Sequence, residues 1–532
     1  MAGHDCDVLI LGGGHNGLVC AAYLAKAGLK VTVLERRGVV GGCVVTEEFF
    51  PGFRNSSAAY TVSLLNPKVI RELELERHGL RILERRAQNF LPSENGGYLL
   101  TGEGRTAREV AKFSRRDAER LAAYGRQLDV FADLLRGLVL ETPPNVVDGG
   151  DWRALPELVR AARLGWRVKG LGLAQERELL KLFTASAGDY LDSWFESDPI
   201  KAVLGFDSVV GNYASPYSAG SAYVLLHHVF GEVNGKKGVW GQAVGGMGAI
   251  TQAMARAAAE RGADIRLNVA VKGVIVERGR AAGAVLTSGE AVRAKTVASS
   301  LNPKLLFTEL VPQGAVTADF HAHMTNWRCG SGTFHVNVAL AELPQFKCLP
   351  GNGDHHTAGI ILAPDLGYME RAYFDARRYG WSREPIVEMV ISSTLDDSLA
   401  PAGRHVASLF CQHAAPALPA GASWDAHREE VADLMIATVG RYAPNFPKAV
   451  LGRKILSPLD LERTFGLTGG DIFHGALSLD QMFSARPALG YANYRTPLPG
   501  LYLCGSGAHP GGGVTGAPGH NAAREILRDL RQ

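Results

Sequence analysis

The feature that most constrains the fold lies near the start of the chain. Residues 7–11 (DVLIL) form a continuous apolar run that suits a strand buried on both faces, and residues 18–27 read as a helix. Residues 30–34 (KVTVL) read as a second strand, which ends in Glu35. Between the first strand and the helix stand three glycines in the spacing G-x-G-x-x-G, namely Gly12, Gly14 and Gly17. This order of elements predicts a βαβ unit that binds a dinucleotide.

Each part of this motif has a physical task. Gly12 allows the tight turn, Gly14 lets the backbone approach a pyrophosphate that a Cβ atom would push away, and Gly17 lets the helix pack closely on the strand. The free N–H groups and the positive end of the helix dipole hold the phosphates. Glu35 is placed to accept hydrogen bonds from the adenosine ribose. The predicted cofactor contacts of this unit are Gly12, Gly14, His15, Asn16, Gly17 and Glu35.

The residues after Glu35 decide which dinucleotide is expected. Arg36 and Arg37 would suit the 2′-phosphate of NADP, but the Glu35 carboxylate would repel that phosphate. The glycine pair Gly41 and Gly42 follows. Glu-x5-Gly-Gly resembles the extended fingerprint of the FAD-binding amine oxidase and phytoene desaturase superfamily, in which the glycine pair passes close to the flavin side of the cofactor. The predicted cofactor is therefore FAD, with Arg36, Arg37, Gly41 and Gly42 among its contacts.

A second segment of the cofactor domain is expected to begin near residue 239. A glycine-rich turn at 239–248 leads into a helix at 249–260. The strands expected after it are 264–268, 271–278, 282–287 and 291–298. This order would extend the sheet of the first βαβ unit. It resembles the second FAD-contacting stretch of the superfamily, which implies that the backbone near Val271 meets the adenine.

The last segment is expected to return to the cofactor. Residues 501–504 (LYLC) read as a strand, a glycine-rich loop follows, and residues 517–530 form the closing helix. Gly511, Gly513 and Gly516 repeat the glycine spacing, but a second dinucleotide site is rejected because no second strand with an acidic residue follows. Backbone N–H groups of this loop are instead expected to lie against the flavin ring or ribityl chain. The predicted contacts are Gly505, Ser506, Gly513 and Val514.

Between these segments the chain changes character. Residues 106–235 read as successive helices, and residues 311–487 contain alternating stretches typical of antiparallel strands. The predicted fold class is α/β, with a discontinuous Rossmann-type FAD-binding domain of the amine-oxidase kind, an inserted α+β substrate domain and a helical region. The predicted boundaries are 1–105, 236–310 and 488–532 for the FAD-binding domain, 106–235 for the helical region that faces substrate or membrane, and 311–487 for the substrate domain.

One basic amphipathic segment suggests a partner. Residues 155–174 (LPELVRAARLGWRVKGLGLA) combine several arginines with Leu, Val and Trp side chains. Such a segment could make peripheral contact with a membrane surface. The preferred interpretation is a helix that packs on the domain core with a solvated basic face, and Gly165 and Gly170 weaken an isolated helix further.

The overall composition excludes several classes. The net charge of +3, from 56 Lys and Arg against 53 Asp and Glu, argues against a nucleic-acid-binding protein. The seven cysteines include no C-x-x-C pair, so neither a metal site nor a redox dithiol is expected, and a reducing cytoplasmic location is predicted. No apolar run approaches the ~18 residues of a membrane span, and the first strand leaves no room for a targeting peptide. A homodimer is a further expectation.

Longer stretches narrow the resemblance. They are HNGLVCAAYL (15–24), VTEEFFPGF (45–53), YVLLHHVFG (223–231), SLDQMFSARP (478–487) and LYLCGSGAHPGGGV (501–514). With the glycine motifs, they make the chain similar from end to end to the phytoene desaturase and carotenoid isomerase branch of FAD-dependent oxidoreductases. It departs from related proteins at Cys43, where amine oxidases carry Arg, and at Ser506, where many flavoproteins carry Asp.

This resemblance implies hydride exchange between an apolar, unsaturated or lipid-like substrate and flavin N5. His509, beside the flavin loop, is the candidate for a catalytic base or for a group that polarises the ring, and a structural role in the loop is the alternative. Two other functions stay open, a redox-neutral polyene isomerase that uses reduced FAD and a non-enzymatic flavin-binding protein that steadies partners.

Overall fold

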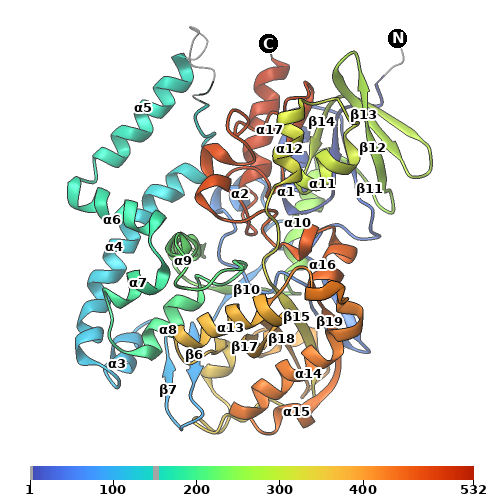
Figure 1. Cartoon of the computed structure of the whole chain (residues 1–532). Helices are drawn as coiled ribbons and strands as arrows, with labels where there is room; N and C mark the ends of the chain where they lie inside the picture. Colours follow the sequence, from blue (N-terminus) through green and yellow to red (C-terminus); the bar gives the residue numbers. More distant parts are fainter. Residues whose placement is uncertain (1–3, 146, 148–154, 532) are drawn as a thin grey trace.

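Two large sheets organise the molecule, which a computed structural model describes at residues 4–145, 147 and 155–531 (Figure 1). In the first sheet the strand order is β11-β2-β1-β14-β13-β12, and β20 pairs with the far end of β14. Its strands are β1 (Cys6–Leu11), β2 (Val31–Leu34), β11 (Asp264–Arg266), β12 (Val271–Glu277), β13 (Arg280–Leu286), β14 (Ala291–Ser299) and β20 (Leu501–Leu503). β11, β2, β1, β14 and β20 run parallel, whereas β12 and β13 form an antiparallel meander.

The two ends of the chain meet in this sheet. β1 lies between β2 and β14, and β14 in turn pairs with the C-terminal strand β20. The apolar residues of β1 are almost completely buried, as expected of a parallel strand covered on both faces. The helices that pack around this sheet are α1 (His15–Lys26), α2 (Pro67–Glu72), α10 (Gly248–Glu260), α11 (Pro303–Leu305), α12 (Ala318–Thr325) and α17 (Ala517–Leu530). The predicted Rossmann-type fold is confirmed.

The second sheet forms the lower half of Figure 1. Its order is β19-β15-β18-β17-β16-β6-β7, and its strands are antiparallel except for the β16–β6 pair. The strands are β6 (Asn89–Pro92), β7 (Tyr98–Leu100), β15 (Phe334–Leu340), β16 (Gly359–Leu362), β17 (Trp381–Val390), β18 (His405–Ala414) and β19 (Val450–Leu456). The helices α13 (Leu366–Tyr379), α14 (Trp424–Tyr442), α15 (Phe446–Ala449) and α16 (Pro458–Phe465) accompany it.

The structure divides the chain differently from the predicted boundaries in three places. The prediction puts 1–105 in the cofactor domain, but β6 and β7 pair into the second sheet, because extended strands need neighbours for their backbone hydrogen bonds. The prediction puts 311–487 in the substrate domain, but Phe320, Met324 and Trp327 are buried in the core of the first sheet. The segment after α16 also lines the cofactor cavities described below.

Short hairpins and a helical layer complete the fold. The small strand pairs are β3 (Thr46–Phe50) with β4 (Phe53–Ser56), β5 (Ile82–Glu84) with β10 (Gly241–Ala243), and β8 (Glu232–Val233) with β9 (Lys236–Lys237). The helical layer contains α3 (Thr106–Val110), α4 (Arg115–Val139), α5 (Leu155–Lys169), α6 (Leu173–Thr184), α7 (Ala187–Asp192), α8 (Asp198–Phe206) and α9 (Ser221–Val229). Phe131, Tyr190 and Phe206 of this layer share a core with Ile386 and Phe410 of the second sheet, so the helical region is not an independent domain.

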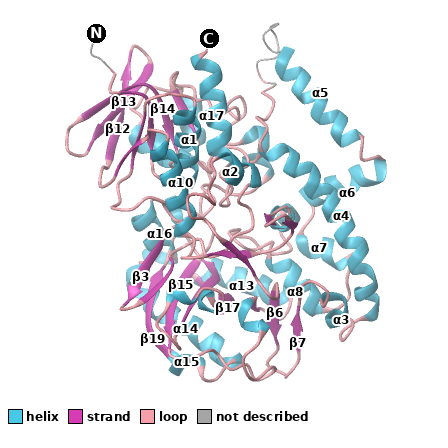
Figure 2. Cartoon of the chain, turned by 180° about the vertical axis from the view of Figure 1, so that it is seen from behind, coloured by secondary structure: helices cyan, strands magenta, loops and turns pink. Residues whose placement is uncertain are grey.

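One helix of this layer differs from the rest. α5 has no buried residue and stands away from the body of the protein in both views (Figures 1 and 2). Val168 of α5 and Leu171 after it pack, partly buried, against the core of the helical layer, whereas the rest of α5 does not sit on the domain core as the preferred interpretation expects. No helix in the described part of the chain combines the length and apolar character needed to cross a bilayer.

A buried histidine of the second sheet gives a testable pH dependence. Burial lowers the pKa of His413 to about 3, and the rings of Tyr213 and Tyr373 surround it. In the unfolded chain a histidine takes up a proton below about pH 6.5. Unfolding therefore binds a proton in this range, and the stability that neutral His413 provides is lost as the pH falls from about 6.5 toward 3.

We expect the free energy of unfolding, measured by urea titration, to fall less steeply between about pH 7 and pH 5 in His413→Gln than in the unchanged protein. The two slopes should differ by up to ~1.4 kcal/mol per pH unit. His427→Gln is the matched control, because His427 lies on the surface of α14 beside Glu430. An identical pH slope in His413→Gln, His427→Gln and the unchanged protein would contradict the assignment.

Candidate functional site

The glycine turn after β1 opens onto a cavity. Gly14 caps the N-terminus of α1 with φ −69° and ψ 168°, a backbone conformation open to any residue. A Cβ atom built on Gly14 would have no heavy atom within 4 Å, whereas one built on Gly17 would lie 2.3 Å from the carbonyl oxygen of Gly12. Gly17 thus sets the close packing of helix on strand, and Gly14 faces open space. Gly41 and Gly42 lie directly beside Gly14, as the glycine-pair prediction requires.

Three adjoining cavities run along the carboxyl edge of the first sheet, the usual ligand position in open α/β sheets. The middle one, of about 70 Å³, we call the phosphate cavity, and its lining includes Gly12, Gly14, His15, Asn16, Glu35, Gly41, Gly42 and Ser506. The adenosine cavity, of about 260 Å³, shares Gly12, Glu35 and Gly42 with it and includes Arg36, Arg37 and Val271. The third cavity, of about 130 Å³, includes Gly513 and Val514, which are expected to lie against the flavin ring, and we call it the ring cavity. It shares His15, Cys43, His474 and Ser506 with the phosphate cavity.

Glu35 lies where the phosphate and adenosine cavities join. Its carboxylate accepts hydrogen bonds from the backbone N–H of Gly13 at 2.9 Å and of Arg37 at 2.9 Å. These bonds fix the side chain at the end of β2, and each oxygen keeps a further lone pair for a ribose hydroxyl. The neighbouring cations are engaged elsewhere. Arg36 donates to the Arg463 carbonyl, and Arg37 pairs with Glu47.

The C-terminal loop joins the amino-terminal unit at the phosphate cavity. Asn16 Nδ2 donates to Ser506 Oγ at 3.0 Å, a contact between residues 490 positions apart. Ser506 and Asn16 are both buried, and the backbone of Gly513 approaches the ring of His15. Gly505 packs so tightly on the end of β14 that a Cβ atom would lie 2.3 Å from the Ser300 carbonyl oxygen. The two glycine-rich segments therefore build one site.

The residues of this site fit FAD. Within the described chain, three buried polar atoms at the phosphate cavity have no hydrogen-bond partner, namely His15 Nε2, Asn16 Oδ1 and His474 Nδ1. A buried polar group without a partner is costly, so such atoms commonly mark a bound ligand or ordered water. The N-terminus of α1 supplies free backbone N–H groups for a diphosphate. Open space at Gly14 gives that diphosphate access to them.

Sequence reasoning missed much of the lining of these cavities, and four of the missed residues show why. Ser300 and Leu301 follow β14 directly and line the phosphate cavity. The rule that ligands bind beyond the carboxyl ends of parallel strands could have found them. Phe465 and Gly466, at the end of α16, line both the phosphate and the adenosine cavities. No local pattern marks them, because the fold of the second half brings them there.

His509 lies outside the lining of all three cavities. Its Nε2 is 3.1 Å from the Leu138 carbonyl oxygen, and its ring meets Phe483 edge to face. Burial lowers its pKa to about 4, so the ring is neutral and ties the loop to the end of α4. The geometry supports the structural alternative rather than the catalytic candidate.

The ring cavity is apolar and uncharged. Tyr60, Val210, Trp240, Phe410 and Ile472 belong to its wall, and no Asp, Glu, Lys or Arg occurs among the described residues that line it. Its histidines are neutral near pH 7, because burial lowers the pKa of His15 and His228 to about 4 and that of His474 to about 3. This is the chemistry of a pocket that takes an uncharged ligand.

Three buried polar residues, Tyr60, Glu388 and Arg85, interact behind this wall. The Tyr60 hydroxyl donates to the buried Glu388 carboxylate, and the buried Arg85 guanidinium lies close enough to act on both groups. Burial raises the pKa of Glu388, and the positive charge of Arg85 opposes that rise. Tyr60 therefore separates the carboxylate from the cavity and holds the wall in place.

Comparison with known proteins agrees with this site. A family model described as flavin containing amine oxidoreductase matches residues 17–333. Pyridine nucleotide-disulfide oxidoreductase domain-containing protein 2 of Rattus norvegicus is 42% identical over 99% of this chain and 94% of its own length. One of the subunits of the limonene dehydrogenase of Castellaniella defragrans is 27% identical over 99% of this chain and 95% of its own.

A solved oxidoreductase from Methanosarcina mazei shares the fold, with a TM-score of 0.60, 17% identity, and coverage of 98% of this chain and 100% of that one. The family match covers more than half of the chain, and the rat relative is similar along nearly its whole length. FAD is thus the cofactor of this site, and the protein is an oxidoreductase. The chain belongs to the flavin containing amine oxidoreductase family.

Proposed function

We propose that this protein is a FAD-dependent dehydrogenase of the phytoene desaturase type, which takes a hydride from an uncharged, unsaturated or lipid-like substrate. The uncharged wall of the ring cavity carries the proposal. An amine substrate is a cation near pH 7, and burying a cation without a carboxylate partner is strongly unfavourable. A hydrocarbon carries no charge, so it enters such a cavity without this desolvation cost. The name of the limonene dehydrogenase relative, an enzyme named for a hydrocarbon, supports the same substrate class.

The protein's own residues do the positioning. FAD, when bound, supplies the hydride acceptor at N5 of its ring. Trp240, Phe410 and Phe473 enclose the cavity with aromatic faces, which hold an unsaturated chain and exclude water. Neutral His15 and His474 stand where this cavity meets the phosphate cavity, so they border the substrate side without placing a charge there.

Anaerobic titration of the holoenzyme tests the proposal. We expect acyclic polyene hydrocarbons dispersed in detergent to bleach the flavin absorbance, while primary amines of similar length leave it unchanged. Bleaching by the amines and not by the polyenes would overturn the substrate class. The isomerase alternative is tested on holoenzyme whose flavin has first been reduced with dithionite, where altered double-bond geometry in the polyene without reoxidation of the flavin would establish it.

A carboxylate placed in the cavity gives a matched test. Leu64→Asp introduces a charge at the wall of the ring cavity, and Leu451→Asp makes the same change on an exposed residue of β19. Because a buried carboxylate attracts water and repels hydrocarbon, we expect polyene reduction of the flavin to slow by about tenfold or more in Leu64→Asp alone. Equal rates in both variants, with flavin retained, would count against this cavity as the substrate site.

A further inference from the structure

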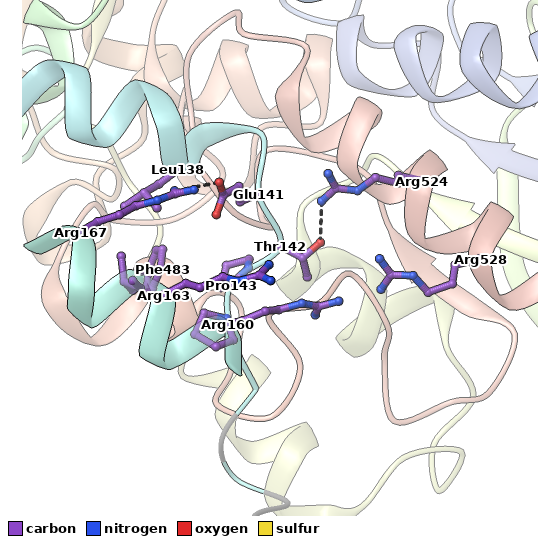
Figure 3. A pocket seen from close by; sticks show the side chains of 12 residues that line it. Leu138, Glu141, Thr142, Pro143, Arg160, Arg163, Arg167, Phe483, Arg524 and Arg528 are labelled. Atoms are coloured by element: carbon purple, nitrogen blue, oxygen red, sulfur yellow. Dashed lines mark hydrogen bonds and ion pairs between the residues drawn. The ribbon is translucent and has the colours of Figure 1, made fainter. Parts of the chain in front are cut away.

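A second cavity, of about 250 Å³, lies between α5 and α17, apart from the flavin site (Figure 3). Five arginines line it. Arg160, Arg163 and Arg167 come from α5, and Arg524 and Arg528 come from α17. Glu141, Thr142, Pro143 and Pro144, which follow α4, also line it. Figure 3 shows arginine side chains entering from both sides, and we call this space the arginine cavity.

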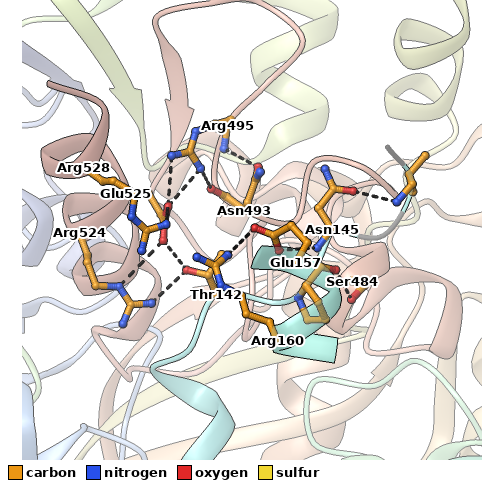
Figure 4. Close-up of polar contacts among 12 residues, drawn as sticks. Thr142, Asn145, Glu157, Arg160, Ser484, Asn493, Arg495, Arg524, Glu525 and Arg528 are labelled. Atoms are coloured by element: carbon orange, nitrogen blue, oxygen red, sulfur yellow. Dashed lines mark hydrogen bonds and ion pairs between the residues drawn. The ribbon is translucent and has the colours of Figure 1, made fainter. Parts of the chain in front are cut away.

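On the α17 side of the arginine cavity, the side chains form a network of hydrogen bonds and ion pairs (Figure 4). Thr142 Oγ1 donates to the buried Glu525 carboxylate at 2.7 Å and accepts from Arg524 Nη2 at 3.0 Å. Arg528 Nη1 donates to the other Glu525 oxygen at 2.8 Å, and Arg495 shares that oxygen. The buried Glu525 carboxylate therefore holds Thr142 and Arg528 in place directly, and Arg524 through Thr142.

The arginine cavity carries excess positive charge. On the α5 side, Arg160 pairs with Glu157 at 2.6 Å and Arg167 with Glu141 at 2.8 Å. Arg163 has no carboxylate partner among the described residues. The five guanidinium groups of the cavity thus have three carboxylate partners, Glu141, Glu157 and Glu525, while Arg495, which shares Glu525, is also paired with Asp529. Like charges held together in a partly enclosed space favour binding of an anion.

We propose that the arginine cavity binds a phosphate group, carried either by a phospholipid headgroup or by a small soluble phosphate ester. The guanidinium fork matches phosphate oxygens in a bidentate way, and arginine stays charged at any physiological pH. The volume is close to the lower end of the ~300–1,000 Å³ typical of small-molecule pockets, which allows a headgroup rather than a single ion. This proposal does not depend on the substrate of the flavin site.

The outer side of α5 favours the lipid source. Leu155 and Trp166 are 62% and 81% exposed, and Leu158 and Val159 are also exposed. Because successive helix residues turn by about 100°, these four side chains fall on one side of α5, next to the side that carries the arginines. Apolar residues beside cationic ones let a helix lie in the interface of an anionic bilayer. A headgroup phosphate in the arginine cavity would hold α5 in that position.

The test uses the full-length holoenzyme and two probes. Co-sedimentation compares vesicles of phosphatidylcholine alone with vesicles that also contain phosphatidylglycerol, and calorimetry titrates glycerol 3-phosphate at low ionic strength. The double variant Arg163→Gln/Arg524→Gln removes one guanidinium from each wall, and Glu525, which loses Arg524, stays paired with Arg495 and Arg528. We expect it to weaken phosphate binding by about tenfold or more. Arg177→Gln on α6, outside the cavity, is the control for a lost surface charge, and it removes one of the two charges that the double variant removes.

The outcomes separate the two sources. If the unchanged protein binds phosphatidylglycerol vesicles and both the double variant and Trp166→Ala fail to bind them, the phosphate belongs to a lipid headgroup. Binding of glycerol 3-phosphate that the double variant loses, with no preference for anionic vesicles, assigns a soluble ester. The proposal is overturned if the unchanged protein binds neither probe, or if the double variant binds as tightly as Arg177→Gln. Unchanged flavin absorbance in every variant separates this result from failure of the flavin site.

Discussion

Gly14→Val is expected to give a folded protein that lacks the yellow flavin absorbance. The backbone at Gly14 already has a conformation that valine adopts readily, and the new side chain would meet no protein atom within 4 Å of its Cβ. It would instead occupy the phosphate cavity, between the helix N–H groups and the diphosphate. A clash of only a few kcal/mol lowers FAD affinity by tenfold for each ~1.4 kcal/mol. Flavin content after gel filtration, with circular dichroism of the same sample, measures both effects.

Two other glycines give the controls. In Gly17→Val the Cβ atom would lie 2.3 Å from the Gly12 carbonyl oxygen, so this change should damage the fold itself. Gly125 lies in α4, where a Cβ atom meets nothing within 4 Å, and Gly125→Val should keep both fold and flavin. Normal flavin content in Gly14→Val would contradict the placement of the diphosphate.

The cofactor half of the fold could be predicted because its signals are local. The strand, glycine turn, helix and acidic residue between residues 7 and 35 are contiguous, and each has a physical task that restricts its residue type. The meander of β12, β13 and β14 also follows from alternating strands with short turns. Even the convergence of Ser506 on Asn16 could be anticipated, because a strand and a glycine loop at the end of the chain repeat the same design.

The remaining parts depend on long-range packing. β6 and β7 look like an extension of the first domain in sequence, but β6 pairs with β16, more than 250 residues later, and β7 pairs with β6 at the edge of that second sheet. Phe465 reaches the cofactor cavities only because α16 packs beside them. His509 sits in the correct loop, but the fold turns its ring toward Leu138. Position in a motif predicts where a backbone goes, whereas tertiary contacts decide where a side chain points.

Arg486 is the strongest case of a residue whose role only the structure shows. Its guanidinium is fully buried and donates to backbone carbonyls of Ser506 at 2.7 Å, Gln481 at 2.8 Å and Phe473 at 2.9 Å. Burial lowers its pKa to about 10, with Asp471 opposing, so it remains charged near pH 7. One side chain thus ties the flavin loop to the segment that carries Phe473, a wall of the ring cavity.

Arg486→Met is therefore expected to lower the free energy of unfolding by on the order of 3–5 kcal/mol and to loosen FAD, because buried carbonyls and Asp471 lose their positive partner. The urea midpoint and the flavin released on gel filtration measure the two effects. Arg328→Met is the control in the same region, since Arg328 forms an exposed pair with Asp480 that is worth only about 0–1 kcal/mol. If both variants matched the unchanged protein, the flavin loop would hold its position without the buried cation, and Phe473 and Ser506 would have to be fixed independently of each other.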